Sequence, residues 1–128
     1  MLGRIHFYFG ITIVLIFLLT GQYMHHQYDH LKNMQLMNRA LFRAGHIYIL
    51  LFGLINVALG INFKSIKTYL LGKIQIIGSI SVFVANFLVI YSFFTELPTE
   101  KIDRPLASIS LYLMLLGIAI HGLTPKKQ

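Results

Sequence analysis

Residues 44–63 of this chain read AGHIYILLFGLINVALGINF, a run of 20 residues without formal charge between Arg43 and Lys64. About 20 apolar residues in a helix cover the roughly 30 Å hydrocarbon core of a bilayer. In lipid the backbone must satisfy its own hydrogen bonds, so a run of this kind forms a helix. The stretch therefore predicts a transmembrane helix and decides the fold class.

Three further runs of the same kind flank this one. The uncharged windows are residues 5–28, 74–95 and 105–125, which hold 24, 22 and 21 residues. The first window is followed by no small-x-small cleavage site, so we expect it to be retained as a helix. We predict an all-α integral membrane protein, a single four-helix bundle over residues 1–128. The expected transmembrane helices are residues 5–25, 44–63, 74–95 and 105–123.

The joint between the first two windows predicts an additional amphipathic helix over about residues 30–43. Apolar side chains recur there at helical spacing, with polar ones between them, at Leu31, Met34, Met37 and Leu41. An amphipathic helix of this kind lies in the membrane interface. We expect it to continue directly into the second transmembrane helix.

The net charge of +7 comes from basic residues dispersed over joints and termini. The basic residues do not gather into a domain that could bind a nucleic-acid duplex, so nucleic acid is excluded as a partner. Basic residues at membrane edges contact anionic lipid and set the orientation. Six basic residues against five favour cytoplasmic N- and C-termini, and we expect the inner membrane of a bacterium. The chain has no cysteine, which excludes disulfides and thiolate chemistry.

Six histidines are the main functional clue, and they fall into two groups. His6 begins the first window and His121 ends the fourth, so antiparallel packing places both at one face. Two imidazoles from different helices at one depth are what a b-type haem requires. Gly10 and Gly117 each lie four residues deeper on the same helix face, where glycine admits a flat group. Alternatively, the histidines face head-group water and the glycines serve helix packing.

The second histidine group lies at the opposite face. Arg39, Arg43 and His46 are spaced i, i+4, i+7 and form one stripe. The two guanidiniums suit haem propionates, a carboxylate or a lipid phosphate. His25 or His26 is then the axial ligand opposite His46. In the competing interpretation the arginines anchor the helix through lipid phosphates, and His46 is an interhelical hydrogen-bonding residue.

The same stretch also suits copper. Thioethers stand beside imidazoles there, at Met24, His25, His26, His30, Met34 and Met37. Thioethers favour Cu(I). The competing interpretation is that Met34 and Met37 only form the apolar side of the amphipathic helix.

Asn56, Ser79 and Asn86 are polar residues inside the windows, and they predict interhelical hydrogen bonds. No acid lies inside a window, which excludes a carboxylate proton relay within the helices. No phosphate loop, nucleophile elbow or zinc-protease motif is present.

Three functions are compatible with these features. The function that we expect first is that of a small b-type haem protein, which carries electrons or anchors a membrane complex. The second is a cofactor-free accessory or assembly subunit of a larger complex, and the third is copper handling. In none of them is the chain expected to be an enzyme by itself. The expected partners are the bilayer and either another membrane protein or further copies of the chain.

Overall fold

A computed structural model of the chain describes residues 1–66, 68–99 and 102–123. These residues form four long helices, which are α1 Leu2–Tyr28, α2 Leu36–Asn62, α3 Tyr69–Thr95 and α4 Pro105–Leu123. Short 3-10 turns follow α1 and α3, namely η1 Asp29–Leu31 and η2 Leu97–Thr99. Each of the four helices is long and apolar enough to cross a membrane. The four-helix membrane fold predicted from the sequence is thus confirmed.

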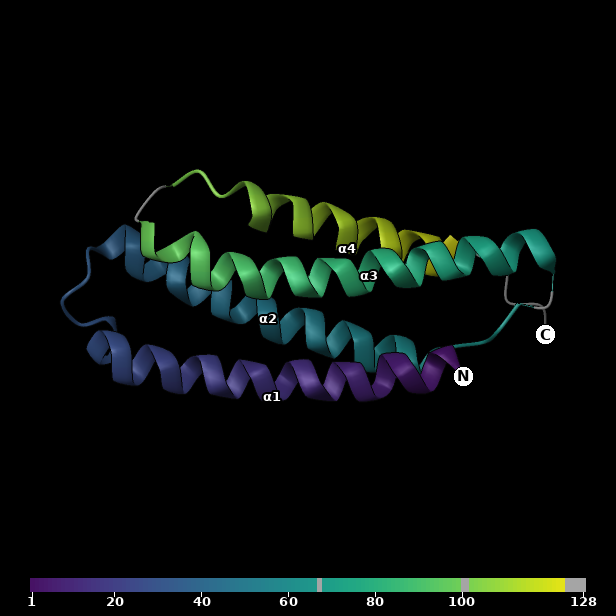
Figure 1. Cartoon of the computed structure of the whole chain (residues 1–128), viewed down its shortest axis with the longest axis horizontal. Helices are drawn as coiled ribbons and strands as arrows, with labels where there is room; N and C mark the ends of the chain where they lie inside the picture. The colour runs from purple at the N-terminus through teal and green to yellow at the C-terminus, as the bar shows by residue number, and fades with distance from the viewer. Residues whose placement is uncertain (67, 100–101, 124–128) are drawn as a thin grey trace.

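The helices run alternately up and down, so the start of α1 and the end of α4 lie at one end of the bundle (Figure 1). We call this end, with the end of α2 and the first part of α3, the His6 end, and the opposite end the His46 end. At about 1.5 Å per residue, the 27 residues of α1 exceed the bilayer core, and α2 and α3 are equally long. These three helices therefore tilt or extend beyond the core, whereas the 19 residues of α4 just span it.

The four helices pack as two hairpins. Helix α1 lies along α2 and α3 lies along α4, whereas contacts between α2 and α3 are less extensive. Glycine permits the close approach within each hairpin. A Cβ on Gly60 would lie 2.5 Å from the backbone nitrogen of Phe7, and a Cβ on Gly117 would collide with the side chain of Val82. Backbones approach this closely only where a side chain is missing.

Aromatic side chains pack together between the two hairpins. Phe9 of α1 meets Phe83 of α3 with ring centroids 4.9 Å apart, and Phe42 of α2 meets Phe93 of α3 at 6.0 Å. Both spacings are typical of favourable aromatic pairs. Large apolar side chains remain exposed along every helix, where lipid takes the place of water as their solvent.

The first joint differs from the expected amphipathic helix. Asp29, His30 and Leu31 have positive φ angles of 44°, 56° and 61°. Because left-handed backbone does not continue a right-handed helix, α1 ends at Tyr28 and α2 begins only at Leu36. The continuous helix expected over residues 30–43 is thus shortened to its second part, the first two turns of α2.

Candidate functional site

A cluster of buried polar side chains lies at the His6 end, where all four helices meet. His6 of α1 and Asn56 of α2 have no exposed surface, and Ser79 of α3 and His121 of α4 are buried beside them. His6 Nδ1 lies 2.9 Å from Asn56 Oδ1, and His6 Nε2 lies 2.9 Å from Ser79 Oγ. Ser79 Oγ in turn lies 3.2 Å from His121 Nε2. These four residues, one from each helix, form what we call the polar network.

Asn56 determines which nitrogen of His6 carries a proton. The Asn56 amide nitrogen donates to the backbone oxygen of Phe52 at 2.9 Å, so its amide oxygen faces His6 and accepts. His6 Nδ1 therefore donates, and Nε2 of the neutral ring is an acceptor. The Ser79 hydroxyl then donates to His6 and accepts from His121 Nε2. The hydrogen bonds of the neutral network thus all run in one sense.

Aromatic rings surround the polar network. Phe83 stacks on His6 with centroids 4.5 Å apart, and Phe63 lies 5.9 Å from His6 and 5.6 Å from His121. The two imidazole rings are 5.7 Å apart and perpendicular to each other. In such apolar surroundings each hydrogen bond is strengthened, and a buried group that loses its partner is costly.

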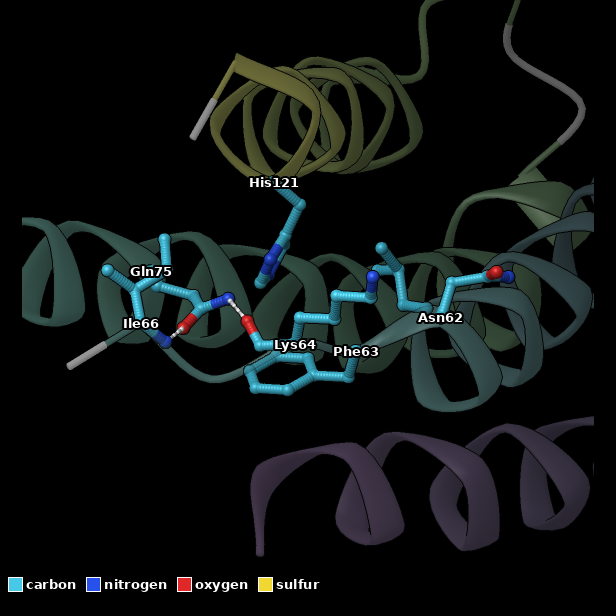
Figure 2. Close-up of a pocket in the computed structure, with 7 residues that line it drawn as sticks. Asn62, Phe63, Lys64, Ile66, Gln75 and His121 are labelled. Carbon is cyan, nitrogen blue, oxygen red and sulfur yellow. Dashed lines mark hydrogen bonds between the residues drawn. The ribbon is translucent and has the colours of Figure 1, made fainter. Parts of the chain in front are cut away.

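A small cavity lies beside His121 at the joint between α2 and α3 (Figure 2). Its volume is about 50 Å³, and its walls include Lys64, Gln75 and His121 but not His6. Gln75 fixes this joint, because its amide donates to the Lys64 backbone oxygen at 2.9 Å and accepts from the Ile66 nitrogen at 3.3 Å. A space of this size with polar walls holds a few water molecules.

The structure brings His6 and His121 together, as the sequence analysis expected of antiparallel helices. It does not leave an open slot beside them, because the helix faces at Gly10 and Gly117 are filled by the neighbouring helix. A Cβ on Gly10 would lie 2.6 Å from the backbone nitrogen of Val57, and one on Gly117 would meet α3. Both glycines therefore serve helix packing in this structure, which was the alternative reading of their positions.

His46 lies at the other end of the bundle, and its hydrogen bond stays within one hairpin. Its Nδ1 is 3.0 Å from Thr20 Oγ1 of α1, and its ring stacks on Phe17 at 4.1 Å. The Thr20 hydroxyl donates to the Phe17 backbone oxygen at 2.8 Å, so His46 Nδ1 is the donor to Thr20. Among the described residues the ring neighbours of His46 are phenylalanines, and neither His25 nor His26 is one of them.

His25, His26 and His30 form an exposed group around the end of α1. The ring centroid of His25 lies 4.7 Å from that of His26 and 3.8 Å from that of His30. Of the nearby thioethers, Met34 is half-buried and Met37 is exposed. Within the described part of the chain, no set of three or more histidine or acidic side chains is arranged to hold a metal ion.

The two arginines of the stripe have different surroundings. Arg39 Nη2 donates to the backbone oxygens of Lys32 and Met34 at 3.0 and 3.2 Å, and it thereby fastens the first joint to α2. Arg43 is exposed one turn later. Both arginines lie at the opposite end of the bundle from the polar network, so they are remote from any group held there.

Two charged residues between α3 and α4, Glu96 and Arg104, are buried at the His46 end. Glu96 accepts hydrogen bonds from the backbone nitrogens of Leu106 at 2.6 Å and Ala107 at 3.1 Å, and it thereby caps α4. Arg104 is 8% exposed, and its Nη1 lies 3.5 Å from the backbone oxygen of Leu41. Burial lowers the pKa of Arg104, and the nearby charge of Glu96 opposes this shift. An acid so far ahead of a helix start gives no local capping signal.

No family model matches this chain, and no curated protein or solved structure matches it either. The polar network is its strongest candidate functional feature, because it joins all four helices and borders the cavity. The positions of His6 and His121 in the sequence alone predicted that these two histidines lie together. From the sequence, Asn56 and Ser79 were expected only to form interhelical hydrogen bonds, and their pairing with His6 depends on how α2 and α3 are rotated about their axes.

Proposed function

We propose that the protein is a cofactor-free accessory or assembly subunit of a larger membrane complex, held together internally by the polar network. One observation carries this proposal. Both ring nitrogens of His6 are engaged by the protein itself, with Asn56 and Ser79 each 2.9 Å away. An axial histidine gives one nitrogen to iron and the other to a supporting acceptor. Asn56 could remain that acceptor, but Ser79 would have to leave.

Loss of the Ser79 contacts has a free-energy cost because the network is buried. Interhelical hydrogen bonds in membranes contribute about 0.6 kcal/mol on average and up to about 2 kcal/mol. A buried polar group left without a partner costs about 1–3 kcal/mol. Loss of these contacts therefore opposes an arrangement in which His6 and His121 bind a metal.

The form of the molecule suits a subunit that acts within the membrane. The described joints between helices are short, and large apolar side chains are exposed on every helix. A partner would contact these helix faces, such as the side of α1 that carries Leu15, Leu18 and Leu19, which are 55%, 56% and 67% exposed. The partner is then another membrane protein or a second copy of this chain. The basic residues favour an N-terminus in the bacterial cytoplasm, with the His6 end facing it.

This function is tested by purifying the tagged full-length protein from its native membranes in several mild detergents. We expect it to carry fixed partner proteins, or a fixed number of its own copies, in constant ratio. A tagged four-helix membrane protein of unrelated sequence, purified in parallel, controls for non-specific association. Recovery of this protein as a monomer without partners in every detergent would contradict the proposal.

A b-type haem protein is the second candidate, because His6 and His121 come from different hairpins and their rings are only 5.7 Å apart. The two histidines would then exchange the Ser79 hydroxyl for iron as the shared partner of their Nε2 atoms. Copper handling by His25 and His26 is the third candidate, favoured by the closeness of their rings. Absorption spectra and metal analysis of one sample distinguish all three functions.

A further inference from the structure

We propose that Arg104 binds the phosphate group of a membrane lipid in the leaflet at the His46 end, through the edge of its guanidinium that carries Nε and Nη2. This binding site goes beyond the proposed function and does not depend on it, because the polar network lies at the other end of the bundle. Three features support it, namely the free donors of Arg104, the acids around it and its depth in the membrane.

The guanidinium of Arg104 has unused hydrogen-bond donors inside the protein. The residue is only 8% exposed, and its Nε and Nη2 atoms have no hydrogen-bond partner among the described residues. Its Nη1 reaches the Leu41 backbone oxygen only at 3.5 Å, beyond the usual length of such a bond. Arginine stays charged in proteins, and a buried charge without a partner is costly. The position therefore calls for an anion.

Arg104 differs in this respect from the other arginines of the chain. Nη2 of Arg39 already donates to two backbone oxygens, so only Nε of that residue is left without a partner. Arg4 and Arg43 are exposed, so water and headgroups reach them. In Arg104 the two free nitrogens lie on one edge of the guanidinium and form a fork, which matches two oxygens of a single phosphate or carboxylate.

The described acids of the chain do not supply the anion. Glu96 is the acid whose charge acts on Arg104, but its two carboxylate oxygens accept hydrogen bonds from Ser92 and from the first turn of α4. Asp29 forms its ion pair within the first joint, and Asp103 is exposed. Within the described part of the chain, the fork is therefore available to an anion from outside the protein.

The depth of Arg104 in the membrane favours a lipid phosphate. Arg104 directly precedes α4, whose 19 residues extend over about 28 Å and just span the hydrocarbon core. Its backbone therefore lies where the core meets the headgroups, and lipid phosphates surround a membrane protein at this level. A carboxylate would require a partner protein that places an acidic side chain beside the start of α4. The phosphate is present wherever the chain is in a bilayer, so we assign the site to it.

The lipid reaches Arg104 between α2 and α4. These two helices scarcely touch, since each packs mainly against the other helix of its own hairpin. The Arg104 side chain extends from α4 to α2, where its Nη2 lies 3.2 Å from the place that a Cβ on Gly45 would take. Ile102 beside it is 72% exposed, so Arg104 points inward from a surface segment. A long arginine side chain turns from such a position to the headgroups while its stem stays on apolar surface, and only the long Nη1 contact is lost.

The test is solid-state NMR of the full-length protein in bilayers of phosphatidylethanolamine and phosphatidylglycerol, in a buffer without phosphate. Dephasing of the arginine Cζ signals by ³¹P measures how close each guanidinium lies to a phosphorus atom. Residues 103 and 104 form the one Asp-Arg pair of the chain, so ¹³C-carbonyl aspartate together with ¹³C,¹⁵N-arginine assigns Arg104 in the wild type. We expect strong dephasing of Arg104 Cζ, as a direct hydrogen bond to the phosphate requires. Absence of dephasing at Arg104 would overturn the proposal.

Two glutamine variants sharpen the test. Arg104→Gln removes the fork, and Arg43→Gln is the matched control, because it removes an exposed arginine at the same end of the bundle. After delipidation in maltoside detergent, native mass spectrometry should find a retained phospholipid on the wild type and on Arg43→Gln. Arg104→Gln should lose it. Equal retention by all three proteins would overturn the proposal. If Arg104→Gln fails to fold, the dephasing of Arg104 in the wild type alone decides.

Other occupants of the fork give different results. Dephasing of Arg104 that appears only when inorganic phosphate is added to the protein in maltoside would show a free anion at the site. A partner protein that is lost in Arg104→Gln, without any ³¹P contact in the wild type, would show that a carboxylate of this partner occupies the fork. Either result would overturn the lipid site. A haem band would contradict the proposed function and leave the lipid site unaffected.

Discussion

His6 and His46 lie near opposite ends of the bundle, and their hydrogen bonds reach different helices. His6 is fully buried, and through Asn56 and Ser79 it connects α1 with α2 and α3. His46 is half-buried, and its hydrogen bond to Thr20 joins only α1 and α2. Within each hairpin, close contacts at glycine residues hold the two helices together. The His6 end thus supplies the polar connection between hairpins that the His46 histidine does not.

The largest expected effect separates these two histidines directly. His6→Ala removes a stacked ring and takes one hydrogen-bond partner from Asn56 and one from Ser79, so we expect it to lower the free energy of unfolding by about 2–4 kcal/mol. His46→Ala should lower it less, by about 1–2 kcal/mol, because this half-buried ring loses one hydrogen bond to Thr20 and its stacking on Phe17. Unfolding measured by steric trapping in bicelles gives both values. Equal losses would show that the two ends do not differ in the way described.

A double-mutant cycle between His6→Ala and Ser79→Ala isolates the connection between hairpins. Residues that share a hydrogen bond give coupling energies of about 0.5–3 kcal/mol, whereas separate residues give nearly none. We therefore expect coupling for this pair. The matched cycle between His6→Ala and Thr20→Val, whose residues share no bond, should give additive effects.

The next largest effect concerns packing inside a hairpin at the same end. Gly60→Ala places a methyl group 2.5 Å from the Phe7 backbone nitrogen, so we expect a loss of about 1–3 kcal/mol. Gly122→Ala is the control, because no atom lies within 4 Å of the added Cβ in the described structure. That change should leave stability unchanged or raise it by about 0.5–1 kcal/mol through helix propensity. Similar stability of the two variants would contradict the close packing of α1 on α2.

A smaller effect is expected at the His46 end, where Glu96 caps α4. Glu96→Gln removes the charge that faces the helix N-terminus but keeps one acceptor, so we expect a loss of about 1 kcal/mol. Asp103→Asn removes an exposed charge close to the same helix start and should change stability less. If Asp103→Asn has the larger effect, Glu96 is not the cap of α4.

The smallest effect is expected for Thr20→Val, which removes the hydrogen-bond partner of His46 but keeps the shape of the side chain. An interhelical bond of this kind contributes about 0.6 kcal/mol. Unfolding measurements should therefore find a loss well below that of His6→Ala. A loss as large as that of His6→Ala would show that the main polar connection between helices lies at the His46 end.

Sequence patterns alone predicted the helical fold and the meeting of His6 with His121. A long uncharged apolar run predicts a transmembrane helix whatever the rotation of that helix about its axis. An even number of antiparallel helices brings the start of the first helix and the end of the last to the same end of the bundle. The roles of Gly10 and Gly117 did not follow from spacing, because an open slot and a close helix contact both require glycine. Only the structure shows that the space beside them is filled.

Other parts of the site depend on features that leave no local signal. Asn56 and Ser79 become partners of His6 through the rotation of α2 and α3, which a single sequence does not specify. The left-handed backbone at residues 29–31 contains no glycine, so the sequence there does not indicate it. Glu96 caps a helix that begins nine residues later, so neither its spacing nor its neighbours indicate the bond.

Asn56 and Ser79 occupy the two ring nitrogens of His6 in the structure, and we propose on this basis that His6 binds no cofactor. The most direct test is a pair of oxidised and dithionite-reduced absorption spectra, with metal analysis, of protein purified after expression with added haem. We expect a colourless protein with no stoichiometric iron or copper. A Soret band with stoichiometric haem that is lost in both His6→Ala and His121→Ala would contradict it.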